Sequence, residues 1–218
     1  MNAIVRTAAL AGMLVLMPAC LVKDTRHTLY LDPDGRLEWT ALETDVHSDG
    51  SDPVAAAAEE EGYLDGVRSG ESGIYRAFRS LDARQADCRI LRDRRPYAVW
   101  TEARFDSLDA VSQSILDRFH VPGQATLRTE NGETCFELVC YPDRAADDAG
   151  EDAKMLEALV EGFDRYRIVL TRGRFTGATG FRLEDNGRAA VPVEPDKDAV
   201  LADGGAVRFA LRWQDAER

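Results

Sequence analysis

Leu29-Tyr30-Leu31-Asp32-Pro33-Asp34-Gly35, with Arg36-Leu37-Glu38-Trp39-Thr40-Ala41 after it, decides the fold class of this chain. Asp-Pro-Asp-Gly is a strong turn sequence, because proline presets one turn angle and glycine accepts left-handed angles. After the turn, apolar Leu37, Trp39 and Ala41 alternate with polar residues, which is the period of a strand with one buried face. The stretch therefore predicts an antiparallel hairpin with a core on one side.

Two further hairpins are expected along the chain. The first joins residues 88–92 to 97–105, and the second joins 124–129 to 133–141 across Asn131-Gly132, a dipeptide typical of tight hairpin turns. Hairpins imply antiparallel pairing, so the sheet is predicted to be antiparallel. Short strands are also expected in the C-terminal part, near residues 166–170, 180–183, 189–193 and 207–213.

Amphipathic helices are expected between the hairpins. The first begins at Pro53 with Asp52 as its N-cap and runs to about Val67. We interpret Glu59–Glu61 in this helix as a solvated charged face. Apolar residues at helical spacing predict the other helices, near residues 74–84, 107–119 and 155–163.

This order of elements predicts an α+β fold, in which an antiparallel sheet built from hairpins carries amphipathic helices packed on one face. One-sided strands leave a face for the helices to cover, so the two kinds of element share one core. Residues 27–218 are assigned to a single α+β domain. An arrangement of two lobes, split at the polar stretch of residues 142–150, is the alternative.

The N-terminal residues differ from everything after them. One cation, Arg6, precedes an apolar run of about 10–12 residues, which is too short for the roughly 20 that a spanning helix needs. A basic end, a short apolar run and a site of small residues are typical of a secretory signal peptide, which we assign to residues 1–19. The run ends in Leu16-Met17-Pro18-Ala19-Cys20.

Leu16–Cys20 resembles the lipobox of bacterial lipoproteins, in which an aliphatic residue and small residues precede an invariant cysteine. Met17 stands where that family prefers leucine, and Pro18 where alanine or serine is commoner. The resemblance implies that the Cys20 thiol receives a diacylglyceryl group, that the chain is cut just before it, and that its new amino group is acylated, with palmitate as a typical chain. The alternative is an ordinary signal peptide in which Cys20 has no role.

Lipidation at Cys20 predicts a cell-envelope protein held on a membrane by its acyl chains, since two or three chains bind a bilayer far better than one. Residues 20–26 are then the lipidated cysteine and a short linker to the domain. In lipoproteins of enteric bacteria an aspartate after the cysteine favours the inner membrane. Leu21 at that position favours the outer membrane, with the domain facing the periplasm.

The composition excludes several classes of protein. Lys and Arg total 27 against 39 Asp and Glu, which gives a net charge of −12. This excludes a protein that binds nucleic acid through bulk positive charge. The same excess of negative charge argues against binding of the protein surface to anionic lipid. Apolar residues at 44% and charged residues at 30% are typical of a globular domain and exclude a polytopic membrane protein.

Three cysteines follow Cys20, at positions 88, 135 and 140. Cys135 and Cys140 would lie about 16 Å apart on opposite faces of one strand, so they cannot pair with each other. An exported domain can keep a disulfide, and Cys88 could join either Cys135 or Cys140. Three buried free thiols are the alternative. A catalytic thiol is not expected, because no histidine stands near any of them in sequence.

Local motifs assign no metal and no cofactor. Asp45-x-His47-x-Asp49-Gly50-x-Asp52 resembles the front half of a calcium loop, but Ala56 occupies the position of the closing glutamate, so an acidic turn that caps the helix is favoured. Gly70-Glu71-Ser72-Gly73 resembles a nucleophile elbow but lacks its spacing, and we interpret it as a linker between helices. The chain has three histidines, His27, His47 and His120. Their spacing is not that of a metal site, so we interpret them as surface or loop residues.

Three functional hypotheses remain open, and no catalytic residue is assigned. The first is a non-enzymatic envelope lipoprotein that binds a protein partner or a small apolar ligand. The second is an anchored hydrolase whose acidic residues converge only in the fold. The third is a structural part of an envelope assembly that extends a neighbour's sheet through its terminal strands, and a bare strand edge near Val207–Trp213 would favour it.

Overall fold

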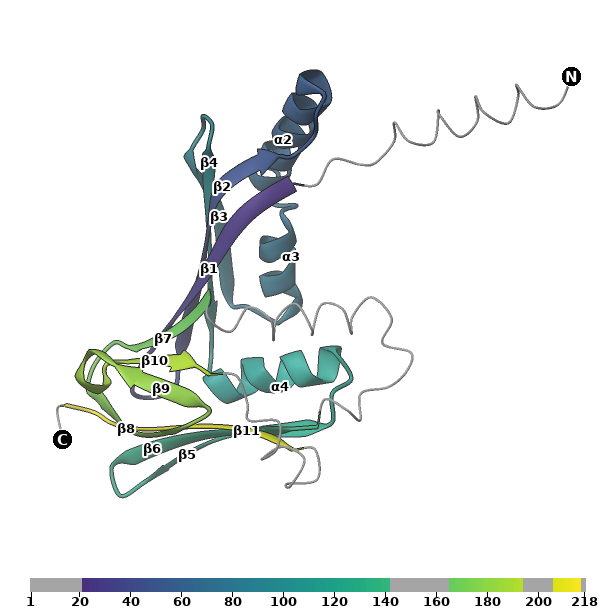
Figure 1. The fold of residues 1–218 in the computed structure, drawn as a ribbon. Coiled ribbons are helices and arrows are strands. Elements are labelled where there is room, and N and C mark those ends of the chain that lie inside the picture. Colours follow the sequence, from purple (N-terminus) through teal and green to yellow (C-terminus); the bar gives the residue numbers. More distant parts are fainter. Residues whose placement is uncertain (1–20, 142–164, 194–205, 217–218) are drawn as a thin grey trace, which may run out of the picture.

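The computed structural model describes residues 21–141, 165–193 and 206–216 (Figure 1). The strands form two sheets, one in the order β3-β4-β2-β1-β7-β10-β9 and one in the order β5-β6-β11-β8. The strands are β1 (Leu21–Leu31), β2 (Leu37–Ser48), β3 (Gln85–Arg92), β4 (Tyr97–Phe105), β5 (Gly123–Glu130), β6 (Glu133–Cys140), β7 (Tyr166–Leu170), β8 (Arg174–Thr179), β9 (Phe181–Glu184), β10 (Ala189–Pro192) and β11 (Val207–Gln214). The helices are α2 (Pro53–Arg68), α3 (Gly73–Ser80) and α4 (Leu108–Arg118), with a 3-10 turn at Asp185–Gly187.

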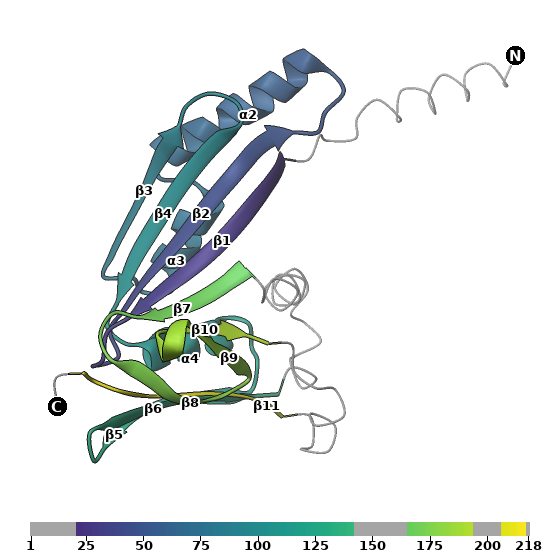
Figure 2. The same cartoon turned by 60° about the vertical axis from the view of Figure 1, so that its left-hand side comes forward.

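Strands β1 to β4 are antiparallel neighbours, and with α2 and α3 they form what we call the upper lobe (Figure 1). Leu37, Trp39 and Ala41 are buried on the face that the two helices cover. The Trp39 ring lies 5.1 Å from the ring of Phe78 on α3. The opposite face of these four strands has no described helix over it (Figure 2), and we call it the open face.

Helix α4 and strands β5 to β11 form the lower lobe. Helix α4 packs on β5 and β6, and its Leu116 forms a small apolar cluster with Cys140. The main core is continuous between the lobes, because Leu31 of β1 and Trp213 of β11 are fully buried in the same cluster as Trp39. The two lobes are therefore held together by apolar burial, the dominant favourable term in folding.

The turn between β1 and β2 joins the lobes. The Trp213 indole Nε1 donates to the Pro33 carbonyl at 3.0 Å, and the Leu108 amide at the start of α4 donates to the Gly35 carbonyl at 2.9 Å. Gly35 has φ +92°, and a Cβ there would overlap the Leu127 side chain of β5. The left-handed angle favours glycine at this position, and a Cβ would in addition require the end of the Leu127 side chain to move.

The predicted α+β fold and its three hairpins are confirmed, and helices pack against the sheets. One pair of strands differs from the expected antiparallel sheet, since β1 and β7 are parallel over His27–Leu31 and Tyr166–Leu170. A parallel pair requires a long crossover, and the chain between these strands includes the whole of the upper helices and α4.

Several boundaries differ from the prediction. Residues 21–26, expected as a linker, are the first half of β1, where they pair with β2. The helix expected over residues 74–84 ends at Ser80, and β8 was not expected as a strand because Phe175 is its single buried residue. The helix expected at 155–163 and the split expected at 142–150 lie outside the described residues. None of the described helices is long and apolar enough to cross a membrane.

Candidate functional site

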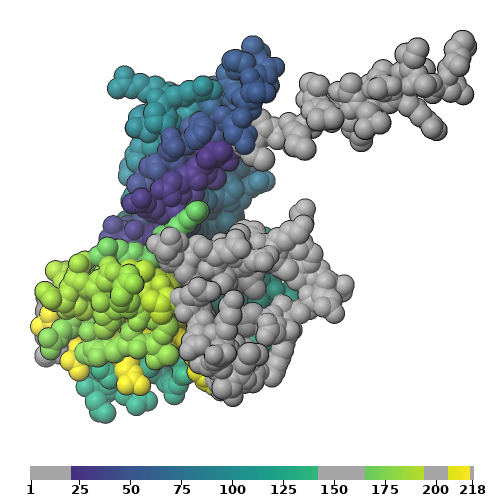
Figure 3. Space-filling view, viewed as in Figure 1, coloured from purple at the N-terminus to yellow at the C-terminus, as the bar shows by residue number. Residues whose placement is uncertain are grey.

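An open cleft of about 790 Å³ lies at the corner where the open face of the upper lobe meets the lower lobe. In the space-filling view this corner is the step on the left, where the lower lobe projects beyond the upper lobe (Figure 3). We call it the corner cleft. It is lined by Tyr30, Asp32, Arg36, Leu37, Glu38, Arg84, Gln85, Arg104, Phe105 and Thr171.

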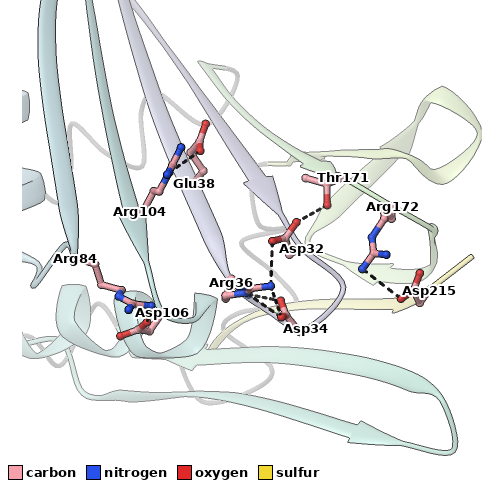
Figure 4. Close-up of polar contacts among 10 residues, drawn as sticks. All are labelled: Asp32, Asp34, Arg36, Glu38, Arg84, Arg104, Asp106, Thr171, Arg172 and Asp215. Carbon is pink, nitrogen blue, oxygen red and sulfur yellow. Dashed lines mark hydrogen bonds and ion pairs between the residues drawn. The ribbon is translucent and has the colours of Figure 1, made fainter. Parts of the chain in front are cut away.

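One wall of the corner cleft is a row of side chains across the open face. The strand registers place Tyr30, Glu38, Arg104 and Gln85 next to one another on β1, β2, β4 and β3. The Arg104 Nε donates to Glu38 Oε2 at 3.0 Å (Figure 4). Tyr30 is 37% exposed, so its ring is accessible to a ligand in the cleft.

The second wall comes from the β1–β2 turn. Arg36 Nε donates to Asp34 Oδ2 at 2.9 Å, and Arg36 Nη2 lies 3.8 Å from Asp32 Oδ2. Thr171, just after β7, donates its hydroxyl to Asp32 Oδ1 at 2.6 Å (Figure 4). The turn itself is closed by the Asp32 amide, which donates to the Arg36 carbonyl at 2.9 Å. Hydrogen bonds thus hold the backbone and the acidic side chains of this wall in place.

Arg84, in the segment between α3 and β3, adds a third arginine to the corner cleft beside Arg104 and Arg36. Arg84 donates from Nη1 to Asp106 Oδ1 at 2.8 Å, and its amide donates to the Arg104 carbonyl at 2.9 Å. Three guanidinium groups, carried by three different segments of the chain, therefore surround one cleft: those of Arg36, Arg84 and Arg104.

These arginines are accessible, since their side chains are 59–66% exposed. Ion pairs between exposed side chains contribute only about 0–1 kcal/mol each, so an incoming anion can replace an acidic partner at small cost. A guanidinium binds a carboxylate or phosphate with two parallel hydrogen bonds. The geometry suits recognition of an anion.

The acidic stretch from Asp45 to Asp52 is the last part of β2 followed by the turn that caps α2, so the capping role favoured from the sequence is confirmed for Asp52. The Asp52 side chain accepts a hydrogen bond from the Val54 amide at 2.9 Å at the start of α2. His47 Nδ1 lies 2.6 Å from the backbone carbonyl of Asp45. Within the described ranges, no group of three or more His, Cys, Asp or Glu side chains is arranged to hold a metal ion.

Ser72 caps a helix, which confirms the linker interpretation of residues 70–73. Its hydroxyl accepts from the Tyr75 amide at 3.3 Å at the start of α3. The three described cysteines, Cys88, Cys135 and Cys140, are free thiols, with Cys88 in one sheet and the other two in the second sheet. Cys140 alone is buried, and burial raises its pKa to about 11.

The interpretation of His27 as a surface or loop residue is wrong. Its ring stacks on Tyr166 at 4.5 Å, and its Nδ1 accepts from the Trp39 indole at 3.1 Å. Burial, with a smaller contribution from Arg165, lowers the pKa of His27 to about 4. His27, Leu29 and Leu31 lie two residues apart and share the buried face of β1. This two-residue period was the signal that could have predicted the burial of His27.

The solvated-face interpretation of Glu59–Glu61 is wrong for Glu60, which is 1% exposed. Its carboxylate accepts from the Ser48 amide at 2.9 Å and from Arg95 Nε at 2.5 Å. Burial raises the pKa of Glu60, but these two donors outweigh it and hold the pKa below its ordinary value. Glu60 lies four residues after Ala56, on the buried stripe of α2, and that spacing predicts burial.

A second buried carboxylate, Glu43, was not identified from the sequence. It is 1% exposed, accepts from the Tyr63 hydroxyl at 2.6 Å and pairs with Lys23. Burial, and after it the Glu43 carboxylate, raise the pKa of Tyr63 well above its ordinary value. In β2, Glu43 follows Trp39 and Ala41 at the same two-residue spacing, on the buried face. This alternation was the signal that could have predicted its burial.

A bare edge near Val207–Trp213 would have favoured the assembly hypothesis, but this segment has no bare edge. This segment is β11, which is paired on one side with β6 and on the other with β8. Its Trp213 indole contributes to the core instead of to an exposed edge. Assembly by strand addition at this segment is therefore excluded, because both of its hydrogen-bonding edges are occupied.

Comparisons with known proteins give one distant likeness. No protein-family model matches the sequence, and no curated protein matches it. Among solved structures, the chain is similar to the NMR structure of the folded domain of LppM (Rv2171) from Mycobacterium tuberculosis, with 10% sequence identity and a TM-score of 0.37. The match covers 88% of this chain and 90% of that chain. At this identity, residue roles do not transfer between the two proteins.

Proposed function

We propose that the protein is a lipid-anchored binding protein of the bacterial cell envelope that takes a small anionic ligand in the corner cleft. The observation that carries this proposal is the meeting of Arg36, Arg84 and Arg104, from three separate segments, around one open cleft of about 790 Å³. Clefts of about 300–1,000 Å³ suit small molecules. In the lining the three arginines outnumber the two acids, Asp32 and Glu38, whereas the chain as a whole has a net charge of −12.

The lining favours an anion over an apolar ligand. Leu37 and Phe105 are only 2% and 5% exposed, so they add little accessible apolar surface, and the remaining residues around the cleft are charged or polar. An apolar molecule would have to displace water from exposed guanidinium and carboxylate groups without replacing their hydrogen bonds, which is unfavourable. A ligand with one or more carboxylate or phosphate groups fits this lining, and the exposed ring of Tyr30 can contact its carbon skeleton.

The anchor is part of the same proposal. Leu16–Cys20 resembles a lipobox, and Leu21 in place of aspartate supports the outer membrane with the domain in the periplasm. Strand β1 begins at Leu21, directly after the cysteine, so the folded domain follows the anchor with no intervening linker. A lipid on Cys20 would hold the domain against the membrane surface.

The anchored-hydrolase alternative has less support. Acid–base hydrolysis by paired carboxylates needs two such groups that face a shared substrate. In the cleft, Glu38 faces Arg104, Asp32 faces Arg36, and Asp106 at its rim faces Arg84. This pairing of acids with arginines supports anion binding.

The ligand proposal is tested by calorimetry with inorganic phosphate, succinate and glycerol phosphate at low ionic strength. We expect at least one of these anions to bind the wild type, and Arg104→Gln to weaken its binding about tenfold, the effect of losing one charge-assisted hydrogen bond. Arg79→Gln removes an exposed arginine from α3, on the helix-covered side, and is the matched control. Equal binding by all three proteins, or no binding of any of these anions, contradicts the proposal.

The anchor is tested separately. Radiolabelled palmitate should mark the wild type expressed in a bacterium with a lipoprotein pathway, and Cys20→Ala should abolish both the label and membrane association. Cys140→Ala, at a buried cysteine of β6, is the control and should keep the label. A wild type without label refutes lipidation while leaving the cleft proposal standing.

A further inference from the structure

The first two turns of α2 extend beyond the end of the sheet. Ser48, the last residue of β2, donates its amide to Glu60 at 2.9 Å and its hydroxyl to Glu59 at 2.5 Å. Glu59 and Glu60 are therefore level with the end of β2, and the six residues before them, 53–58, continue for about 9 Å at 1.5 Å per residue. Figure 1 shows this part of α2 standing above the start of β1 and the end of β2.

This extension is apolar and accessible. Val54 is 78% exposed, the highest value among the exposed large hydrophobic side chains, while Ala56 is the one residue of the extension that is buried. Val54, Ala57 and Ala58 lie at positions i, i+3 and i+4, so they share one face of the helix. These side chains give the start of α2 a small exposed apolar face, next to the end of the sheet where β1 begins.

The same end of the molecule carries the start of β1. Leu21 pairs with Ser48, and Val22, which is 41% exposed, pairs with His47. Cys20 is bonded to Leu21, so the two Cα atoms are about 3.8 Å apart. The exposed apolar side chains of α2 and the cysteine of the lipobox therefore belong to one end of the upper lobe.

We infer that this end, comprising Val22, Val54, Ala55, Ala57 and Ala58, lies in the interfacial layer of the bilayer that holds the lipids of Cys20. The inference rests on the proposed function, because it takes Cys20 to be lipidated. We call these five residues the anchor-side patch. Apolar faces of amphipathic helices enter a bilayer by about 5–10 Å, which matches the roughly 9 Å by which α2 overhangs the sheet.

The lipid anchor makes a weak surface contact sufficient. Valine and alanine bury little area, so the anchor-side patch alone would bind vesicles poorly. A tether of one residue gives it a very high effective concentration at the membrane, and binding then costs no further loss of translation. Acidic residues border the patch, notably Asp52, Glu59 and Glu61, so the contact favours a neutral lipid surface over an anionic one.

This orientation determines the source of the ligand. The corner cleft lies at the other end of β1, and eleven residues of strand span about 35 Å. With the anchor-side patch on the bilayer, the cleft faces the aqueous space well beyond the headgroups of the same membrane. The anion it binds is then a soluble molecule of that compartment and not a headgroup of the anchoring bilayer.

The test uses the lipidated full-length protein in vesicles of phosphatidylethanolamine and phosphatidylcholine that contain brominated acyl chains. A tryptophan placed by Val54→Trp should be quenched at least about twofold more than one placed by Thr176→Trp, because only the first lies in the bilayer interface. Thr176 is an exposed residue of β8 in the lower lobe and is the matched control. The wild-type signal, from Trp39, Trp100 and Trp213, is subtracted from both.

A second variant guards against an effect of the probe. Val54→Asp places a charge on the anchor-side patch at an exposed position, so the fold should be unaffected. It should still float with the vesicles through Cys20, while amide hydrogen exchange over residues 49–58 rises several-fold above that of the wild type. Equal quenching at positions 54 and 176, in protein that floats, refutes the inference and leaves the anchor intact. Protein that does not float refutes both.

Discussion

Charged pairs gather at both ends of the upper lobe, but they differ in what covers them. Under α2, Glu43 and Glu60 are each 1% exposed and are held by Tyr63 and Arg95. At the corner cleft, the pair of Glu38 with Arg104 is 36% and 59% exposed. The upper lobe thus carries two sets of charged contacts, one whose carboxylates are buried beside α2 while Arg95 is 56% exposed, and one left on the open face.

The difference separates pairs that hold the structure from pairs that can be exchanged. A buried carboxylate that loses its partner pays its full desolvation cost, so buried pairs resist substitution. An exposed pair gains little from its partner and yields it to a competing ion. Burial therefore assigns the α2 end to stability and the corner cleft to binding, although both are built from the same residue types.

The largest effect is expected at the buried end. Glu43→Ala leaves the Tyr63 hydroxyl without its acceptor and Lys23 without its carboxylate. We expect the free energy of unfolding to fall by about 3 kcal/mol, measured by urea denaturation. Glu43→Gln keeps an acceptor for Tyr63 and should lose less. Glu38→Ala is the matched control at the cleft, where a loss above about 1 kcal/mol would contradict the division between the two ends.

An effect of pH is expected from His27, which lies on β1 between the two ends. Its folded pKa, about 4, is below the unfolded value of 6.5, so the unfolded chain takes up the proton first as the pH falls. The stability that a neutral His27 contributes is therefore complete above pH 6.5 and is lost progressively toward pH 4. The loss from this residue reaches up to about 3 kcal/mol.

His27→Gln removes this titration and serves as the comparison. Denaturation of the two proteins between pH 7 and pH 4 should show a steeper fall for the wild type, and the two curves should converge at low pH. His47 and His120 are present in both proteins and cancel. Parallel curves would show that His27 titrates alike in the folded and unfolded states. Glu60, whose pKa is lowered, should add a further loss only at lower pH, below its ordinary value of 4.5.

Much of the fold could be predicted because local signals agreed with tertiary structure. The Asp32–Gly35 turn has strong turn chemistry, and the alternation of Leu37, Trp39 and Ala41 matches a face that helices cover. The role of that turn as a joint was not predictable, because it depends on Trp213 and Leu108, which are distant in sequence. The parallel pairing of β1 with β7 is likewise a long-range choice, with no local pattern to mark it.

The candidate site was harder to predict for a physical reason. Arg36, Arg84 and Arg104 belong to no motif, since two strand registers and a turn bring them together. The buried glutamates were missed because acidic residues were assigned to solvent by type, although Glu43 and Glu60 occupy apolar positions of their periods. Periodicity was the better guide to burial at these positions than residue type.

The smallest effect on stability, and the sharpest test of the comparison, is expected from Glu38→Gln. The substitution keeps the size of the side chain and removes the charge that competes for Arg104. The free energy of unfolding should change by less than about 1 kcal/mol, because the pair is exposed.

Binding of the anion identified for the wild type should strengthen by about threefold, since the ligand no longer displaces a carboxylate. Glu102→Gln, on the same face of β4 two residues away, is the control and should leave affinity unchanged. Weaker binding by Glu38→Gln would mean that Glu38 orients Arg104 for the ligand, and the exposed pairs of the corner cleft would then be as structural as the buried ones.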